Sequence, residues 1–265
     1  MTTNRKTQHR SAIDPQALAG RKAVVTGGTI GMGRAIVRAL TDRGAEVLYT
    51  GRDDQRLAEA RAALGTPLAH PVRSDASDAD AIDALRDQVA DRLGGIDHLF
   101  VNQGIAEFQT LEEVTEESWD RIFDVNAKGA FFTVQRLAPL MAEGGSIVFT
   151  TVSNDQIFPG LSAYSAAKEA VAAFSKVLAA ELLPRRIRVN VIAPGFILTP
   201  TMGVAGLTEE QRAEFVEQGN ASTPMGRGGT VEEVAAAALY LAVEATFTTG
   251  VELAVDGGFG QGLGA

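Results

Sequence analysis

Short apolar runs alternate along this chain with longer stretches in which apolar residues recur every three or four positions. Short apolar runs are typical of buried strands, and the wider spacing is typical of helices with one buried face. Their alternation predicts an α/β fold, a parallel sheet with helices on both faces. The predicted strands cover residues 23–26, 47–49, 68–72, 98–101, 146–150, 188–192 and 252–255.

The helical stretches carry their own start and stop signals. Predicted helices begin near Gly31, Asp54, Asp78, Glu117, Ser162 and Thr230. The stretch from 162 to 183 is rich in alanine and ends before Pro184, because proline disfavours helical geometry in the preceding residue. Its small side chains allow close packing against its own sheet or against a second subunit.

Residues 195–229 depart from the alternation. Thr208 and Gln211 form a capping-box pattern that predicts a short helix within them. Because ligands bind beyond the carboxyl ends of strands in open parallel sheets, this insertion is interpreted as a substrate lid, with an ordinary surface excursion as the alternative. Residues 1–17 are predicted to be a flexible extension, which leaves residues 18–265 as one domain.

Tyr164 and Lys168 are the most informative pair of polar residues. Four positions apart on a predicted helix, they share one face. An ammonium group near a phenol favours the phenolate, so Lys168 is expected to lower the pKa of Tyr164. Tyr164 could then exchange a proton with a substrate oxygen near neutral pH. A solvated helix pair is the alternative reading.

A glycine-rich turn, Thr-Gly-Gly-Thr-Ile-Gly-Met-Gly at 26–33, follows the first predicted strand and opens a helix. Strand, glycine turn and helix in this order are typical of a dinucleotide site, where the backbone approaches a pyrophosphate at a helix N-terminus. A glycine turn without a ligand is the alternative.

Together these motifs resemble the short-chain dehydrogenase/reductase family, from Leu18 to Gly258. Asn102-Gln103-Gly104 is similar to the family's Asn-Ala-Gly motif, with Gln103 in place of alanine. Asn126 lies where the family has its fourth catalytic residue. The resemblance implies a Rossmann-type doubly wound sheet of about seven strands in the order 3-2-1-4-5-6-7, a nicotinamide cofactor, and a homodimer or homotetramer.

The resemblance also assigns residues to the cofactor. It implies contacts from Gly27, Thr29, Ile30, Gly31, Gly33, Arg52, Asp75, Ala76, Asn102, Gly104, Tyr164, Lys168, Pro194, Gly195, Ile197 and Thr199. Two of these are ambiguous, since Asp75 could instead cap the next helix, and Asn102 serves the central sheet as much as the cofactor.

Arg52 predicts a preference for NADP(H) over NAD(H). NAD-binding proteins commonly place an acidic residue after the second strand, where this chain has Gly51. The guanidinium of Arg52 can grip a 2′-phosphate with two hydrogen bonds. Asp53, Asp54 and the apolar Ile30 argue in the other direction, and a solvated loop charge is the alternative for Arg52.

The resemblance places a serine thirteen residues before the catalytic tyrosine, and here that position is Thr151. Thr151 is expected to hydrogen-bond the reacting oxygen, with Ser153 as the alternative. Tyr164 is expected to act as general acid and base, Lys168 to bind the nicotinamide ribose, and Asn126 to hold a water molecule that leads to solvent. The resemblance implies that the substrate is a carbonyl compound or a secondary alcohol.

Composition narrows the classes of partner, metal site and cellular location that this chain could have. The 265 residues carry a net charge of −9, which disfavours nucleic acid as a partner. The chain has no cysteine, which excludes disulfides and thiolate ligands and suits the cytoplasm, and its three histidines lack metal-binding spacing. No apolar stretch is long enough to span a membrane.

Substrate identity stays open at this point. Residues expected to face the substrate are Gln103, Ile105, Asn154, Gln156, Phe158, Phe196, Leu198 and Met202, a partly apolar set. A nucleotide-sensing regulator without catalysis and a structural relative of the fold are the alternatives to an enzyme.

Overall fold

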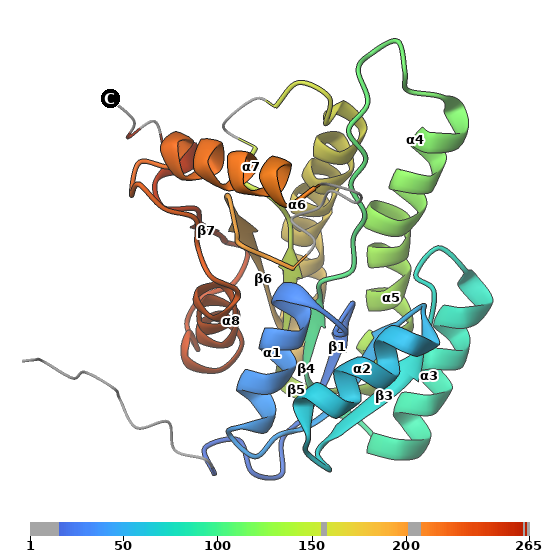
Figure 1. Ribbon diagram of the computed structural model, residues 1–265. Helices are drawn as coiled ribbons and strands as arrows, with labels where there is room; N and C mark the ends of the chain where they lie inside the picture. Colours follow the sequence, from blue (N-terminus) through green and yellow to red (C-terminus); the bar gives the residue numbers. More distant parts are fainter. Residues whose placement is uncertain (1–15, 155–157, 201–207, 262, 264–265) are drawn as a thin grey trace, which may run out of the picture.

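The computed structural model describes residues 16–154, 158–200, 208–261 and 263. It contains a seven-stranded parallel sheet in the order β3-β2-β1-β4-β5-β6-β7, as the family resemblance implied (Figure 1). The strands are β1 (Lys22–Thr26), β2 (Glu46–Gly51), β3 (Ala69–Arg73), β4 (Ile96–Val101), β5 (Met141–Thr150), β6 (Arg188–Pro194) and β7 (Glu252–Val255).

Helices cover both faces of the sheet. They are α1 (Gly31–Thr41), α2 (Asp54–Leu64), α3 (Ala79–Leu93), α4 (Glu116–Phe123), α5 (Gly129–Leu137), α6 (Ser162–Leu182), α7 (Glu209–Ser222) and α8 (Val231–Leu239). One apolar core joins α1, α2 and α8 to one face, and a second joins α3, α5 and α6 to the other. Burial on both faces explains why the central strands β1 and β5 contain continuous apolar runs.

Shorter helical turns complete the chain. The π-helical turn η1 (Asp124–Lys128) joins α4 to α5, and η4 (Tyr240–Glu244) extends α8. The 3₁₀ turns are η2 (Ala138–Leu140), η3 (Leu183–Arg185) and η5 (Phe259–Gln261). Among the described residues, no helix is both long enough and apolar enough to cross a membrane.

Several predicted boundaries are confirmed, and others are wrong. β7 matches its predicted range, and α1 and α6 begin at Gly31 and Ser162 as expected. Two helices begin one residue later than predicted because Asp78 and Thr230 are their N-caps. β5 begins five residues earlier than predicted, at Met141, and α5 was not predicted as a separate helix.

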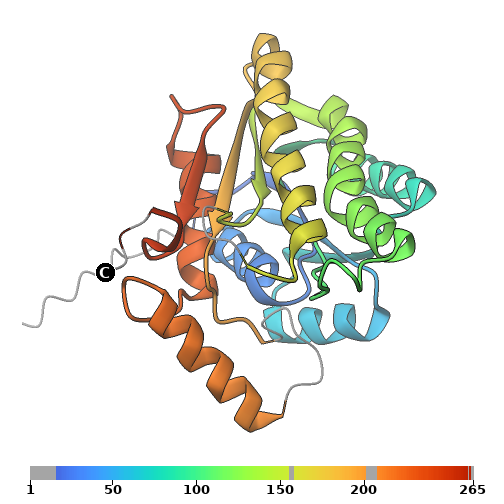
Figure 2. The same cartoon turned by 90° about the horizontal axis from the view of Figure 1, so that it is seen from above.

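Within the 195–229 segment, helix α7 lies outside the sheet and apart from the helices that cover its faces (Figure 2). Thr208 and Gln211 make the predicted capping box, but α7 is a helix of 14 residues. α7 has no fully buried residue. Its contact with the body includes Phe215, whose ring meets Phe196 edge-on at 5.7 Å between centroids. The predicted extension up to residue 15, together with Gln156 and Met202, lies outside the described residues.

Candidate active site

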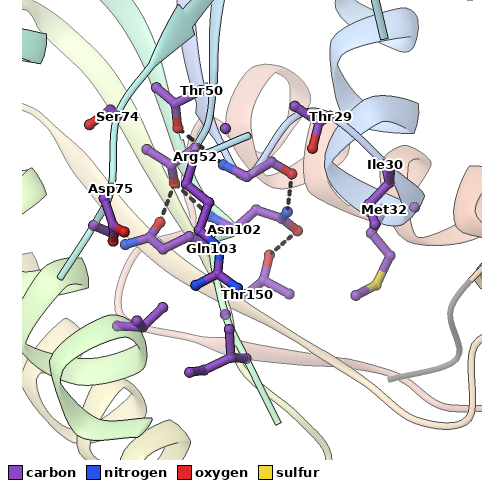
Figure 3. A pocket seen from close by; sticks show the side chains of 18 of the residues that line it. Thr29, Ile30, Met32, Thr50, Arg52, Ser74, Asp75, Asn102, Gln103 and Thr150 are labelled. Atoms are coloured by element: carbon purple, nitrogen blue, oxygen red, sulfur yellow. Dashed lines mark hydrogen bonds between the residues drawn. The ribbon is translucent and has the colours of Figure 1, made fainter. Parts of the chain in front are cut away.

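A cleft of about 350 Å³ opens where β1, β2, β4 and β5 end. Ser74 and Asp75 line one side of it and Ile30 and Met32 the other, with Asn102 between them (Figure 3). In an open parallel sheet, this edge is the place where ligands bind. The cleft therefore joins the glycine turn to the helix that carries Tyr164.

The glycine turn needs glycine for two separate reasons. Gly27 and Gly31 have φ values of +64° and +54°, which other residues rarely adopt. A Cβ on Gly33 would lie 2.1 Å from the carbonyl oxygen of Gly27, so only glycine allows the helix to start so close to the turn. The N-cap of α1 is Ile30, whose apolar side chain makes no cap hydrogen bond. Backbone N–H groups at such a helix N-terminus suit an anion.

Asn102 links the strand ends that line the cleft through two side-chain hydrogen bonds. Its amide Nδ2 donates to the carbonyl of Gly27 at 3.3 Å, and its Oδ1 accepts from the hydroxyl of Thr150 at 3.2 Å. These bonds join the ends of β1, β4 and β5 (Figure 3). Asn102 thus serves the sheet while also lining the cleft.

The far end of the cleft is positively charged. Arg52 and Arg56 both line it. A Cβ on Gly51 would lie 2.5 Å from the methyl group of Thr29, so an acidic side chain has no room there without rearrangement. Sequence reasoning did not identify Arg56; its place in the first turn of α2, four residues after Arg52, was the available signal.

The two carboxylates that follow Arg52, those of Asp53 and Asp54, each interact with another group of the protein. Asp53 caps α2 by accepting from the backbone N–H of Arg56 at 2.8 Å. Asp54 lies 3.9 Å from Arg73. The negative charge that argued against a phosphate site is therefore partly compensated within the loop.

Asp75 lines the cleft beside Arg52. It does not cap α3, because that cap is Asp78. Burial works against its charged form, but hydrogen bonds from the backbone and hydroxyl of Ser77, together with Arg52 and Arg73, hold the pKa of this carboxyl below its usual range. Asp75 is thus an anionic hydrogen-bond acceptor at neutral pH.

Tyr164 and Lys168 occupy the other end of the cleft on one face of α6. The Lys168 side chain is buried, and its Nζ donates to the carbonyl of Thr150 at 3.0 Å and to that of Gln103 at 3.5 Å. Nζ lies 5.9 Å from the centre of the Tyr164 ring. The ammonium is held by backbone carbonyls at the sheet edge and stays close to the phenol.

Burial shifts both groups away from their charged forms. It raises the pKa of Tyr164 to about 12 and lowers the pKa of Lys168 to about 8. Desolvation of the phenol therefore outweighs the lowering expected from Lys168, and the pKa of Tyr164 is raised, not lowered. Tyr164 is a proton donor over the neutral range.

Asn126 is fully buried in the π-helical turn η1. Its Nδ2 donates to the carbonyls of Ile105 and Ile122 at 2.8 and 2.9 Å, and its Oδ1 accepts from the N–H of Ile105 at 3.2 Å. A Cβ on Gly104 would lie 2.7 Å from this Oδ1 and 3.1 Å from Lys168 Nζ. Asn126 therefore fixes the backbone beside the ammonium. Short π-helical turns are frequent at functional sites.

The two candidate hydroxyls turn toward carboxylates near the C-terminus. Thr151 lines the cleft, and its Oγ1 donates to Glu252 at 2.9 Å and lies 3.2 Å from the carbonyl of Ile192. The Oγ of Ser153 donates to Asp256 at 3.2 Å. Neither hydroxyl is hydrogen-bonded to Tyr164 within the described residues.

The other expected site residues divide into two groups. Those that line the cleft are Gly27, Thr29, Ile30, Gly31, Arg52, Asp75, Ala76, Asn102, Gln103, Gly104, Ile105 and Thr199. Those outside its wall are Gly33, Asn126, Asn154, Phe158, Pro194, Gly195, Phe196, Ile197 and Leu198.

Packing explains several of the second group. Ile197 is buried in the core and forms a bridge with Gly229, and Phe196 packs under α7 against Gly219. Asn154 donates to Glu169 at 2.8 Å and to the carbonyl of Ser165 at 3.3 Å.

Polar groups at the cleft fit a dinucleotide better than a metal ion. The described residues contain no cluster of three or more histidine or acidic side chains that could hold a metal. Glycine backbone, a helix N-terminus and arginine side chains are instead the groups that bind phosphates. The residues present therefore fit a nicotinamide dinucleotide.

Comparison with known proteins agrees with this geometry. Residues 27–260 match the family model described as enoyl-(acyl carrier protein) reductase. An uncharacterized oxidoreductase of Methylorubrum extorquens is 39% identical over 91% of this chain and 98% of its own length. The NADP-dependent (R)-specific alcohol dehydrogenase of Lentilactobacillus kefiri is 34% identical over 91% and 97%.

A solved structure gives the same result. The short-chain type dehydrogenase/reductase from Mycobacterium marinum aligns with a TM-score of 0.83 and 32% identity, over 93% of this chain and 98% of that one. The chain belongs to the short-chain dehydrogenase/reductase family. It is an oxidoreductase of the kind that uses a nicotinamide cofactor and acts on small molecules.

Proposed function

We propose that this protein transfers hydride between NADP(H) and a carbonyl compound or secondary alcohol, with Tyr164 as general acid and base. The observation that carries the proposal is the buried Lys168 ammonium beside Tyr164, in the same cleft as the glycine turn. A buried cation is costly, so its position next to a proton donor supports a chemical role.

The NADP(H) preference rests on charge and space. Arg52 and Arg56 offer guanidinium groups to a 2′-phosphate, while Thr29 blocks an acidic side chain at position 51. The Lentilactobacillus kefiri relative, named as NADP-dependent, supports the same choice. NAD(H) is the alternative cofactor.

The chain's own groups supply the proton chemistry. The reduced cofactor provides hydride when it is bound. Tyr164, protonated because burial keeps its pKa high, donates a proton to the oxygen that becomes the alcohol. The Lys168 ammonium donates two of its three hydrogens to backbone carbonyls. Its third hydrogen is available to a hydroxyl of the nicotinamide ribose. In the oxidative direction Tyr164 accepts the proton instead.

Thr151 is the hydroxyl that we place beside the reacting oxygen, since it lines the cleft. To donate there, its single proton must leave Glu252, so we expect Thr151 to contribute less than Tyr164. Asn126 has donated both amide hydrogens to backbone carbonyls. We therefore place the water that links Lys168 to solvent at the main-chain carbonyl of Asn126.

We also propose a cytoplasmic homodimer or homotetramer with the 195–229 segment as a substrate lid. Exposed apolar side chains on α6 and near β7, among them Val177, Tyr240 and Phe247, support self-association. Sedimentation equilibrium would measure the assembly directly, and a monomer at all concentrations would contradict it.

The deciding experiment is a spectrophotometric panel of ketones, aldehydes and secondary alcohols with both cofactors, for wild type and Tyr164→Phe. We expect NADPH oxidation by wild type and a loss of about a thousandfold in Tyr164→Phe, with NADPH affinity unchanged. A variant that keeps most of the rate contradicts the role of Tyr164. Tight cofactor binding without turnover of any compound favours the nucleotide-sensing alternative, and no binding of either cofactor favours the structural one.

A further inference from the structure

The chain turns sharply after β7, at residues 256–261, which we call the C-terminal turn. Asp256 organises this turn: Oδ1 accepts from the N–H of Gly258 at 2.9 Å, and Oδ2 accepts from the N–H of Gly260 at 2.8 Å. Asp256 and Phe259 are both buried, at 8% and 2% exposure. The turn is therefore fixed to the end of the sheet.

Two side chains of this turn reach the connection between β5 and α6, about 100 residues earlier, of which the structure describes residues 151–154 and 158–161. Asp256 Oδ2 also accepts from the Ser153 hydroxyl at 3.2 Å. The Phe259 ring stacks on Phe158 with 5.4 Å between centroids and 9° between planes. One contact lies at each end of the connection, whose last residues lead directly into the helix carrying Tyr164.

The same turn also contacts the base of the 195–229 segment. The N–H of Met225 donates to the carbonyl of Gly257 at 3.2 Å. A Cβ on Gly257 would lie 2.7 Å from the methyl group of Thr223, so the Thr223 side chain packs directly against the backbone of Gly257. The C-terminal turn thus lies between two segments that each contribute one residue to the cleft wall, Thr151 from the β5–α6 connection and Thr199 from the 195–229 segment.

We propose that Asp256 and Phe259 are positioning residues that hold the two described parts of the β5–α6 connection, 151–154 and 158–161, in place through Ser153 and Phe158. This inference rests on the proposed function for its catalytic consequence. The Ser153 hydroxyl gives its single proton to a buried carboxylate, so its role is to anchor this connection. Phe158 is 47% exposed, so the stacking on Phe259 restrains a ring that solvent would otherwise leave free.

Hydrogen exchange tests this positioning without a substrate. Three backbone amides report on the connection: Ser153 donates to the carbonyl of Pro194, Leu161 to that of Phe158, and Gln109 to that of Gly160. We expect Ser153→Ala and Phe158→Leu each to speed exchange at these amides by about threefold to tenfold. Phe158→Tyr keeps the stacked ring and is the matched control, with exchange within about twofold of wild type.

Three outcomes overturn the proposal. One is unchanged exchange in both Ser153→Ala and Phe158→Leu, and another is an equal increase in the β1 amides, which indicates global destabilisation. The third is equal effects of Phe158→Tyr and Phe158→Leu. Phe158 is half exposed and Ser153→Ala removes one hydroxyl, so both variants are expected to fold, which circular dichroism checks.

Kinetics with the fastest ketone of the panel test the catalytic consequence. We expect Phe158→Leu and Phe259→Leu to raise KM about fivefold with kcat and NADPH affinity within about twofold, and Phe158→Tyr to restore KM. An unchanged KM overturns a role in substrate binding. If wild type reduces nothing in the panel, the proposed function fails while hydrogen exchange still decides the positioning.

Discussion

The two ends of the cleft are built in different ways. At the phosphate end, the glycine turn at 26–33 and the arginines after β2 each lie within a few consecutive residues. At the reaction end, Thr151 meets Glu252 and Ser153 meets Asp256, across 101 and 103 residues. The first end depends on backbone shape and exposed charge, and the second on buried side chains from distant parts of the chain.

This difference predicts which changes affect binding and which affect turnover. Substitutions at the phosphate end should weaken the cofactor while leaving its reaction possible. Substitutions at the reaction end should change rate and pH dependence while leaving the cofactor bound. The following predictions test that separation in order of expected effect.

Gly33→Ala should have the largest effect on binding. Its Cβ would lie 2.1 Å from the Gly27 carbonyl oxygen, so the turn cannot keep its shape. We expect both nicotinamide cofactors to lose about 100-fold in affinity or more, measured by fluorescence titration. Gly20→Asn is the control, because nothing lies within 4 Å of that position and asparagine tolerates its positive φ. Near-normal cofactor affinity in Gly33→Ala would contradict the claim that cofactor binding depends on the backbone shape of the glycine turn.

Arg52→Ala should lower the affinity for NADPH much more than the affinity for NADH. Loss of a charged hydrogen bond to the 2′-phosphate should lower NADPH affinity about tenfold to a hundredfold and leave NADH affinity within about threefold. Arg61→Ala is the matched control, because Arg61 is an exposed arginine in the last turn of the following helix, α2. Equal losses of affinity for NADPH and NADH would contradict a role for Arg52 in binding the 2′-phosphate.

Lys168 should make cofactor affinity depend on pH. Burial lowers its pKa to about 8, so the ammonium is present below that pH and is lost as pH rises through it. We expect affinity to be flat near pH 6.5 and to fall by up to about tenfold per unit above pH 8. The trend should hold for NADH, which has no 2′-phosphate, and should vanish in Lys168→Met. A dependence that survives in Lys168→Met contradicts the assignment.

Thr151→Val should have the smallest effect. Its hydroxyl already donates to Glu252, so we expect kcat to fall about threefold to tenfold, far less than in Tyr164→Phe. Thr151→Ser keeps the hydroxyl and should stay within about threefold of wild type. Steady-state kinetics at saturating cofactor measure both. A loss in Thr151→Val as large as that of Tyr164→Phe would show that the hydroxyl leaves Glu252 during reaction.

The contrast between local sequence patterns and contacts of distant residues also explains what could be predicted from the sequence. The sheet, the starts of α1 and α6, and the pairing of Tyr164 with Lys168 depend on short-range patterns, and the structure agrees with them. Burial could not be predicted, and it reverses the expected pKa shift of Tyr164. The carboxylate partners of Thr151 and Ser153 could not be predicted either, because no local signal links β5 to β7.

Two further features were missed for the same reason. The π-helical turn around Asn126 has no sequence signature in its own five residues. The C-terminal turn reaches Phe158 only once all seven strands have been placed in order. Both are consequences of assembled packing.

A crystal structure with bound NADP and a ketone inhibitor tests the central claim most directly. The account predicts that the Tyr164 hydroxyl lies within hydrogen-bond distance of the ketone oxygen, with Lys168 on the nicotinamide ribose. A Tyr164 hydroxyl directed away from the nicotinamide ring in every subunit would contradict it.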